Sequence, residues 1–274
     1  MDYIQRLNSL FSYYRSALTS YSIHSPFAYD FIESVLLDKK TDFSFDEIEN
    51  VRKTLLKDHT ALKRTDLGAG SSGKSQKSSS VSEIARKSLS PPKTGRMYYK
   101  MVKHYGYKSI LELGTSLGIS CLYLASACPE GKVVTIEGDP LVHKIAVDTG
   151  KEIGLNNINW LEGEFDSHLS DLPSLGAPFD LVLMDGNHSY EPTISYFEKL
   201  WPQMQSGGAI IVDDIHWSVG MTAAWNEIKE NFESAFFFET WRFGIAFKSV
   251  APANGPNIKW IPGYLKPWSA GFFK

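Results

Sequence analysis

Acidic residues follow five apolar segments of this 274-residue chain, and their spacing could support chemistry at one site. The segments are typical of buried β-strands, and each one leads into a polar turn at its acidic residue. In an open parallel sheet, ligands bind beyond the carboxyl ends of the strands, so these acids would share one edge. We expect a functional site at that edge, built from Glu112, Glu137, Glu164, Asp185 and the pair Asp213-Asp214.

The first of these segments continues into a glycine-rich turn. Residues 109–119 read SILELGTSLGI, and a helix-compatible segment follows as far as Ala127. A strand, a glycine turn and a helix N-terminus let a ligand approach the backbone closely. The next predicted strand ends at Glu137, which is 19 residues after Gly118 (137 minus 118). This is close to the offset of about 20 residues at which a strand-end acid binds a ribose hydroxyl.

Two motifs, E-L-G-x-S-x-G at 112–118 and I-E-G-D-P at 136–140, carry a family resemblance. They resemble the first two motifs of class I S-adenosylmethionine-dependent methyltransferases, and are nearest to the O-methyltransferases related to catechol O-methyltransferase. The resemblance covers roughly residues 95–248 and implies S-adenosylmethionine as the cofactor. The glycine spacing differs from the G-x-G-x-x-G of dinucleotide sites. A carboxylate at Glu112 would repel a pyrophosphate and favour an ammonium such as that of a methionine moiety.

The resemblance also implies which residues bind the cofactor. Glu137 would bind the ribose, Glu164 would accept from the adenine amino group, and Phe165 would lie against the ring. Glu164 has an equally good alternative role as an acid at a helix start, where the helix dipole favours negative charge. The expected cofactor residues are Glu112, Gly114, Thr115, Ser116, Gly118, Glu137, Gly138, Glu164, Phe165 and Asp185.

The fourth and fifth predicted strands end in three carboxylates: Asp185, Asp213 and Asp214. Carboxylates that lie close together need a cation or a proton between them, and Mg²⁺ prefers oxygen ligands. Enzymes related to catechol O-methyltransferase hold a metal with an acid from the fourth strand and an Asp-Asn pair from the fifth. This chain has Asp-Asp instead, so the match is partial. We expect an Mg²⁺ site here; the alternative is that one aspartate caps a helix and another binds the cofactor.

Two histidines, His188 and His216, follow strand-end aspartates and are candidate general bases. The resemblance favours His188, because relatives with D-G-x-H-x-Y at this position keep the histidine at the pocket. The expected catalytic residues are therefore His188, Asp185 and His216, and the expected reaction is O-methylation of a small molecule. A first alternative is a regulatory protein that binds S-adenosylmethionine without chemistry.

The alternation of strands and helices predicts an α/β fold with a doubly wound, mostly parallel, seven-stranded sheet of the Rossmann-like methyltransferase type. The last two strands are too close in sequence for a crossover helix and should form an antiparallel hairpin. Predicted strands span 108–113, 132–137, 158–162, 179–184, 208–213, 235–240 and 243–248. Helices are expected near 94–105, 118–127, 140–153, 190–204 and 220–232.

The chain divides by composition into three predicted segments. Residues 1–93 would form an N-terminal helical appendage and a Gly/Ser-rich loop, 94–250 the cofactor-binding domain, and 251–274 an irregular tail. The loop contains a second alternative, because Gly68–Ser75 matches the phosphate-binding pattern G-x-x-x-x-G-K-[ST]. The polar approach HTALKRTD at 59–66 argues against a P-loop phosphotransferase, which needs a buried apolar strand there. The loop could instead be flexible or close over the cofactor.

The overall composition limits the partners that we expect. A formal net charge of −3 gives no basis for general nucleic-acid binding. The two cysteines, Cys121 and Cys128, are expected as buried thiols in a reducing compartment, and no segment suits a signal peptide or a membrane span. The sequence therefore predicts a cytoplasmic protein, and the family resemblance implies a small-molecule acceptor. The aromatic-rich N-terminal helices could pack on a second copy of the chain.

Overall fold

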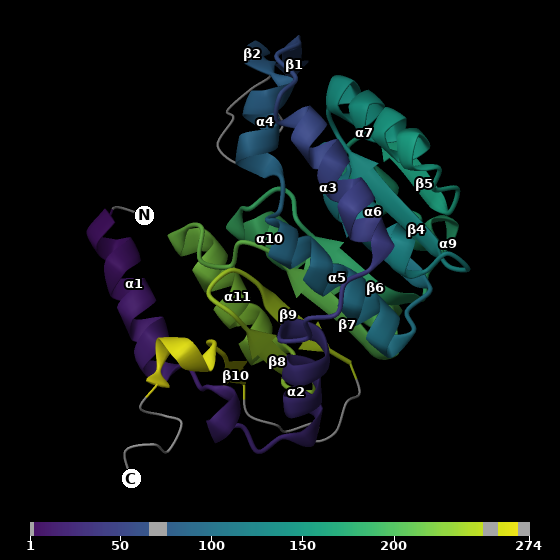
Figure 1. Ribbon diagram of the computed structural model, residues 1–274. Helices are drawn as coiled ribbons and strands as arrows, with labels where there is room; N and C mark the ends of the chain where they lie inside the picture. The colour runs from purple at the N-terminus through teal and green to yellow at the C-terminus, as the bar shows by residue number, and fades with distance from the viewer. Residues whose placement is uncertain (1–2, 66–75, 249–256, 268–274) are drawn as a thin grey trace. The chain divides into compact units, whose positions relative to one another are not determined.

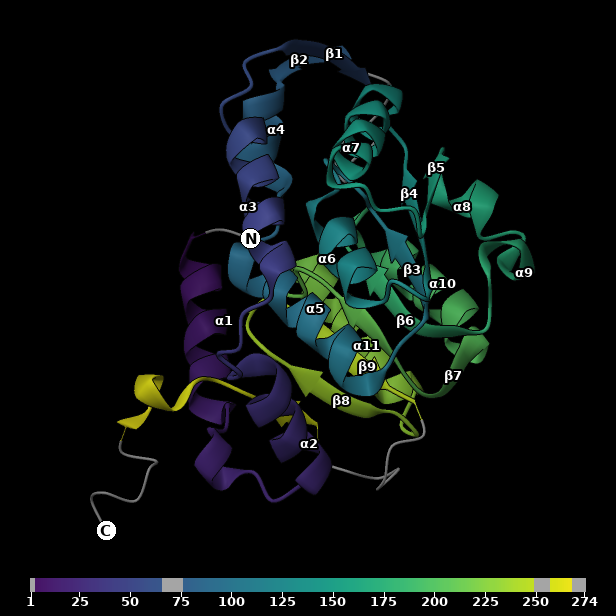
Figure 2. The same cartoon turned by 45° about the vertical axis from the view of Figure 1, so that its right-hand side comes forward.

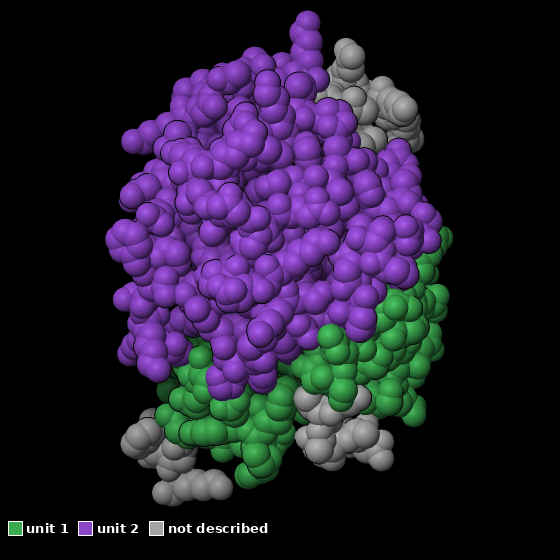
Figure 3. All heavy atoms as spheres, turned by 90° about the vertical axis from the view of Figure 1, so that its right-hand side faces the viewer, with its two compact units in different colours: residues 1–37, 188–274 green, residues 38–187 purple. Residues whose placement is uncertain are grey.

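The structure is a computed structural model that describes residues 3–65, 76–248 and 257–267 (Figure 1). The chain divides into two compact units, coloured separately in Figure 3. Unit 1 comprises residues 1–37 and 188–274, and unit 2 comprises residues 38–187. These units do not coincide with the three predicted segments, since the first 37 residues group with the C-terminal part of the chain. No helix among the described residues is both long and apolar enough to cross a membrane.

Unit 2 is built on four parallel strands in the order β6-β3-β4-β5. They are β3 (Ser109–Leu113), β4 (Lys132–Glu137), β5 (Ile158–Glu162) and β6 (Phe179–Met184). In register, Leu111 of β3 lies between Val134 of β4 and Val182 of β6, and all three are buried. Runs of apolar residues suit a parallel sheet that is covered on both faces.

The helices of unit 2 include the three that were expected near 94–105, 118–127 and 140–153. They are α3 (Phe43–Leu55), α4 (Val81–Ser88), α5 (Pro92–Tyr105), α6 (Ile119–Ala127), α7 (Pro140–Ile153), α8 (Phe165–His168) and α9 (Leu172–Leu175). Figures 1 and 2 show α3, α5 and α6 packed side by side. The start of α7 is fixed by Asp139, whose carboxylate accepts from Leu141 N at 2.9 Å and Val142 N at 3.2 Å.

The segment predicted as a Gly/Ser-rich loop differs from that expectation at both ends. Strands β1 (Ala61–Thr65) and β2 (Gln76–Ser80) pair antiparallel, from Ala61 opposite Ser80 to Thr65 opposite Gln76. The phosphate-binding pattern Gly68–Ser75 lies outside the described residues. A strand that pairs with an antiparallel neighbour is not the strand that leads from a parallel sheet into a P-loop helix.

Unit 1 contains the antiparallel part of the fold. Its strands are β7 (Met204–Val212), β8 (Phe236–Glu239), β9 (Gly244–Phe247) and β10 (Ile258–Lys259). Strand β9 runs antiparallel to both β7 and β8, whereas β10 runs parallel to β8. The predicted fold class, with its antiparallel last hairpin, is therefore confirmed, and all seven predicted strands are present. Strand β10 is an addition inside the tail that was expected to be irregular.

The helices of unit 1 come from both ends of the chain. They are α1 (Tyr3–Ser16), α2 (Pro26–Phe31), the π-helical turn η2 (Ile32–Leu36), α10 (Tyr190–Leu200), α11 (Val219–Asn231) and the short 3-10 turns η1 (Ser20–Ser22), η3 (Trp201–Gln203) and η4 (Gly263–Leu265). Aromatic packing explains why the N-terminal residues group here. Phe31 is fully buried, and its ring lies 5.0 Å from that of Phe238 and 5.5 Å from that of Phe247. Phe27 contacts Phe247 in the same way, at 4.9 Å.

We expect Phe31→Ala to lower the free energy of unfolding by about 3–5 kcal/mol, because it leaves a cavity among buried aromatic rings. The measurement is urea unfolding followed by tryptophan fluorescence. Tyr29→Ala is a matched control on the same helix, since Tyr29 is 49% exposed and its loss should change stability by less than about 0.5 kcal/mol. Equal effects of the two substitutions would contradict the packing described for the N-terminal residues.

Candidate active site

The glycine turn after β3 lies directly against the end of β6. Gly114 has a φ of +104°, and a Cβ built there would lie 2.3 Å from the backbone oxygen of Asp185. Asp185 N also donates to Leu113 O at 2.9 Å. Gly118, with a φ of +89°, comes immediately before α6. Side chains cannot be accommodated at Gly114, so the glycine permits the close approach that brings the turn and Asp185 together.

Glu137 is held at the end of β4 by two backbone donors. Its Oε2 accepts from Ser116 N at 2.8 Å, and its Oε1 accepts from Asp139 N at 2.9 Å. A carboxylate can accept about four hydrogen bonds, so two fixed donors set its orientation without using all of that capacity. Ser116 has a φ of +48°, an unusual conformation for a residue with a side chain that is typical of functional turns. The structure thus brings the two predicted motifs together at Glu137.

Two expected cofactor residues, Glu112 and Thr115, lie behind the turn instead of at its surface. The Glu112 side chain is fully buried and accepts from Thr135 Oγ1 at 2.5 Å. Thr115 is also buried, and its hydroxyl lies 2.5 Å from that of Thr135. Burial raises the pKa of Glu112 to about 7, and the hydrogen bond from Thr135 partly opposes that rise. Glu112 is therefore enclosed by the protein, and its expected attraction for an ammonium and its part in cofactor binding stay predictions.

The expected adenine-binding residues follow β5. Phe165 begins α8, and its ring lies so close to Gly186 that a Cβ built on that glycine would be 2.8 Å from Phe165 Cζ. Glu164 is exposed and sits at the N-cap position of α8 without a capping hydrogen bond from its side chain. The structure places Phe165 beside Gly186, the residue after Asp185. The contacts of Glu164 and Phe165 with adenine stay predictions.

Two serines that the sequence did not single out also reach this region. Ser88, at the end of α4, lies with its Oγ 2.7 Å from Ser116 Oγ. Ser90 is buried and donates to Asp185 Oδ2 at 3.5 Å, a long contact. The connection between α4 and α5 therefore borders both the glycine turn and the end of β6. The only local sequence signal was the helix-breaking Pro91-Pro92 that follows, which gave no indication of a site.

In unit 1, Asp213 forms an ion pair that no sequence motif indicated. Its carboxylate is fully buried and accepts from Arg242 Nε at 2.9 Å and from Arg242 Nη2 at 2.6 Å. Arg242 comes from the turn between β8 and β9. The expected Mg²⁺ ligands therefore do not fit a metal site as they stand, because a guanidinium already neutralises Asp213. Among the residues that the structure describes, no group of three or more His, Cys, Asp or Glu side chains could hold a metal.

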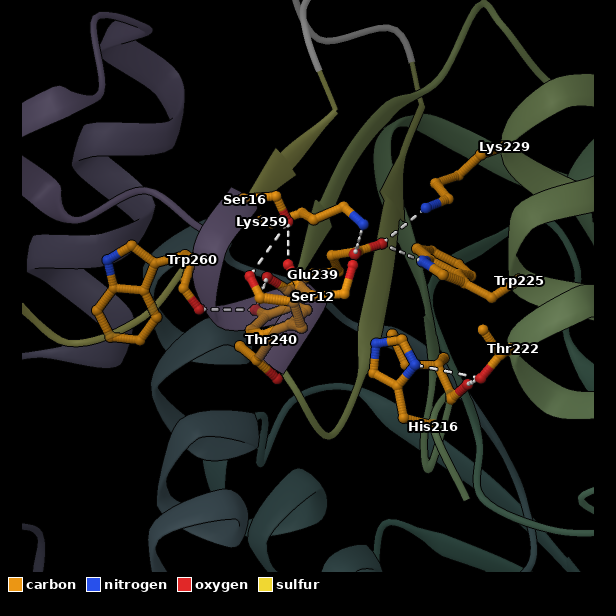
Figure 4. A network of polar contacts seen from close by, with 12 residues as sticks. Ser12, Ser16, His216, Thr222, Trp225, Lys229, Glu239, Thr240, Lys259 and Trp260 are labelled. Atoms are coloured by element: carbon orange, nitrogen blue, oxygen red, sulfur yellow. Dashed lines mark hydrogen bonds and ion pairs between the residues drawn. The ribbon is translucent and has the colours of Figure 1, made fainter. Parts of the chain in front are cut away.

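His216 is buried in an aromatic environment. Its ring stacks on Trp241 at 4.5 Å and meets the edge of Tyr13 at 5.7 Å. Its Nδ1 lies 3.2 Å from Thr222 Oγ1, as Figure 4 shows. Burial lowers the pKa of His216 to about 4, and the nearby Glu239 carboxylate only partly offsets this. A ring with this pKa is a weak acceptor of protons near neutrality, so the structure favours a packing role for His216 over the expected role as a base.

Positive φ angles occur at Asp214 and at the residue before His188. Asn187, directly before His188, has a φ of +50°, and Asp214 itself has a φ of +53°. His188 is half-buried and immediately precedes Ser189, the N-cap residue of α10. Strained residues of this kind gather at functional sites more often than elsewhere. The roles of His188 as a base and of Asp185 as a catalytic residue stay predictions.

Comparisons with known proteins agree with this geometry. Residues 111–215, from β3 to just beyond β7, match the family model of a methyltransferase domain. The chain has the fold of a methyltransferase. Its structure is similar to that of an O-methyltransferase from Bacillus cereus in complex with SAH, with a TM-score of 0.54, 19% identity and coverage of 80% of this chain and 96% of that one. It is also similar to an SAH-bound methyltransferase from Podospora anserina, with a TM-score of 0.56, 14% identity and coverage of 82% and 96%.

A curated relative is similar in sequence as well. Catechol O-methyltransferase from Niastella koreensis is 29% identical over 127 residues, which are 45% of this chain and 57% of the relative. This chain thus spans little more than half the length of that relative. The resemblance to class I S-adenosylmethionine-dependent methyltransferases that the two motifs predicted is confirmed by these matches.

The pKa of His216 gives a prediction about stability. A histidine whose folded pKa lies below its unfolded value of about 6.5 stabilises the protein fully above that pH, and this contribution is lost as pH falls toward 4. We expect wild-type protein to lose more unfolding free energy between pH 7 and pH 4 than His216→Phe, which keeps the stack on Trp241. Urea unfolding at several pH values measures this, and identical pH dependence in both proteins would contradict a buried neutral imidazole.

Proposed function

We propose that this chain transfers the methyl group of S-adenosylmethionine to a hydroxyl oxygen of a small-molecule acceptor. The observation that carries the proposal is the Glu137 carboxylate, oriented by Ser116 N of the glycine turn and by Asp139 N. This arrangement lies within the segment that matches the methyltransferase family model. The names of the similar proteins, a catechol O-methyltransferase and an O-methyltransferase, support oxygen as the acceptor atom.

The residues at the strand ends of unit 2 suit the donor. Glu137 would accept hydrogen bonds from the ribose hydroxyls, and the glycines at 114 and 118 leave room for a ligand to approach the backbone. Phe165 would lie against the adenine ring, and Asp185, with its backbone fixed by Leu113, would face the methionine end. Glu112 and Thr115 would act indirectly, since both hold the shape of the turn through Thr135.

The chain's own contribution to the reaction would be alignment and proton removal. Bound S-adenosylmethionine supplies an electrophilic methyl group, so the protein needs to orient the acceptor hydroxyl and increase its nucleophilicity. His188 follows Asp185 by three residues and is half-buried, which suits a group that accepts the hydroxyl proton. No step is assigned to Mg²⁺, because Arg242 occupies the Asp213 carboxylate.

The alternatives have less support. A regulatory protein that binds the donor without chemistry is not favoured by relatives that are named as O-methyltransferases. A P-loop phosphotransferase is disfavoured by the antiparallel pairing of β1 with β2.

The proposal also includes a cytoplasmic location and assembly with a second copy of the chain. Free buried Cys121 and Cys128 suit a cytoplasmic location, and exposed Leu7, Leu10 and Phe11 on α1 suit assembly with a second copy.

Glu137→Ala tests the donor site. We expect S-adenosylmethionine to bind about tenfold to a hundredfold more weakly, because charge-assisted hydrogen bonds to the ribose are lost. Isothermal titration calorimetry measures the dissociation constant. Glu130→Ala, at an exposed carboxylate just before β4, should bind like wild type. Unchanged binding in a folded Glu137→Ala protein would rule out the proposed ribose site.

His188→Ala tests the base, with catechol and a monohydroxy phenol as acceptors. Removing a general base should lower kcat by about 10²–10⁴-fold while the dissociation constant of S-adenosylmethionine stays unchanged. Methyl transfer from isotopically labelled donor measures the rate. His104→Ala, an exposed histidine on α5, serves as the control and should keep the wild-type rate. A His188→Ala enzyme with wild-type kcat would move the proton-accepting role to another group.

A further inference from the structure

Asp213 and Asp214, the two carboxylates of unit 1 that were expected to bind a metal, already face a cation. This cation is the guanidinium of Arg242. Asp213 accepts from Arg242 Nε with Oδ1 at 2.9 Å and with Oδ2 at 3.1 Å, and from Arg242 Nη2 with Oδ2 at 2.6 Å. Asp214 N donates to Asp213 Oδ1 at 2.9 Å. These four contacts match the number of hydrogen bonds that a carboxylate can accept, about four. A metal ion that coordinated Asp213 would have to displace at least one of these donors.

The backbone around Arg242 holds the guanidinium in place. Within the turn between β8 and β9, Thr240 Oγ1 accepts from Arg242 N at 3.2 Å and from Phe243 N at 3.1 Å. Across the turn, Ile215 N donates to Arg242 O at 3.0 Å. The residue after Asp214 is therefore tied to the backbone of Arg242, and Asp213 is tied to its side chain. Arg242 is positioned before any ligand arrives.

The neighbouring groups add to this constraint. Arg242 Nε also lies 4.0 Å from Asp214 Oδ1, so one guanidinium faces both carboxylates that were expected to bind a metal. Trp241, the residue before Arg242, stacks on His216 at 4.5 Å. Within one turn, Trp241 thus contacts His216, and the next residue, Arg242, contacts Asp213. Because arginine does not lose its proton in proteins, this positive charge is permanent.

We infer that Arg242 takes the position of a divalent cation at the end of β7, so that this chain neutralises Asp213 and Asp214 internally and does not bind Mg²⁺ there. What this inference implies for the methyl acceptor rests on the proposed function. The two effects that a metal would supply, polarising a hydroxyl and holding two adjacent acceptor oxygens, are then absent at Asp213. An acceptor of this enzyme needs no vicinal pair of hydroxyls, and its proton goes to a side chain.

Manganese binding tests the inference without needing an acceptor. The probe is Mn²⁺, and the loss of the paramagnetic resonance signal of free Mn²⁺ reports how much is bound. We expect wild-type protein to bind no stoichiometric Mn²⁺ through Asp213. In Arg242→Ala the carboxylates lose their cation, so Mn²⁺ affinity should rise by at least about tenfold and the ion should raise the unfolding temperature. The double variant Arg242→Ala/Asp213→Asn should lose both effects, and Arg86→Ala, at an exposed arginine of α4, should behave as wild type.

Two results would overturn the inference. One is stoichiometric Mn²⁺ binding by wild-type protein that Asp213→Asn abolishes. The other is a folded Arg242→Ala protein that gains neither Mn²⁺ binding nor thermal stabilisation by the ion. Arg242→Gln, which keeps a donor toward Asp213 without the charge, replaces the alanine variant if that protein does not fold. Titration of wild-type protein with S-adenosylmethionine separates the two proposals, since absent donor binding would defeat the proposed function and leave the Mn²⁺ result standing.

Discussion

A carboxylate withdrawn from water needs a proton, an N–H donor or a cation, and this requirement determines the partners of five acids at or near strand ends. Glu112 is fully buried, and burial raises its pKa to about 7 while Thr135 donates to it. Glu137 receives two backbone N–H groups, and Asp139 receives the first N–H groups of α7. Asp213 receives a guanidinium. Buried Glu239 is a fifth case: burial would raise its pKa, but the ammonium groups of Lys229 and Lys259 hold it below its usual range (Figure 4).

The hydrogen-bond and ion-pair partners of these acids lie at different distances along the chain. That difference explains which contacts the sequence could predict. Glu137 is satisfied by the glycine turn and by the residue two positions on, so local motifs were enough to place it. The strands were predictable for a similar reason, since apolar runs that end in polar turns have a clear period and length. Arg242 is 29 residues from Asp213, in a hairpin turn without a motif. No local pattern could pair them.

Other contacts that the sequence could not indicate also join residues that are far apart in the chain. The burial of Glu112 depends on Thr135, which lies on the neighbouring strand 23 residues away. The grouping of residues 1–37 with unit 1 depends on Phe27 and Phe31, whose partners Phe238 and Phe247 are more than two hundred residues later. A helical stripe of aromatic residues predicts that a helix packs, but it does not say on which surface. The burial of His216 was likewise not predictable, because Trp241 and Tyr13, which pack against it, are distant in sequence.

The proposed donor and acceptor sides therefore differ in what specifies them. On the donor side, backbone N–H groups and glycines do the positioning, so a short motif encodes most of the geometry. On the acceptor side, the geometry comes from side chains that meet only after folding, such as Asp213 with Arg242 and His216 with Trp241. A single change in the turn between β8 and β9 would alter the charge at Asp213 without altering any donor-side motif. The charge at Asp213 and the cofactor motifs of this chain are therefore encoded by different residues.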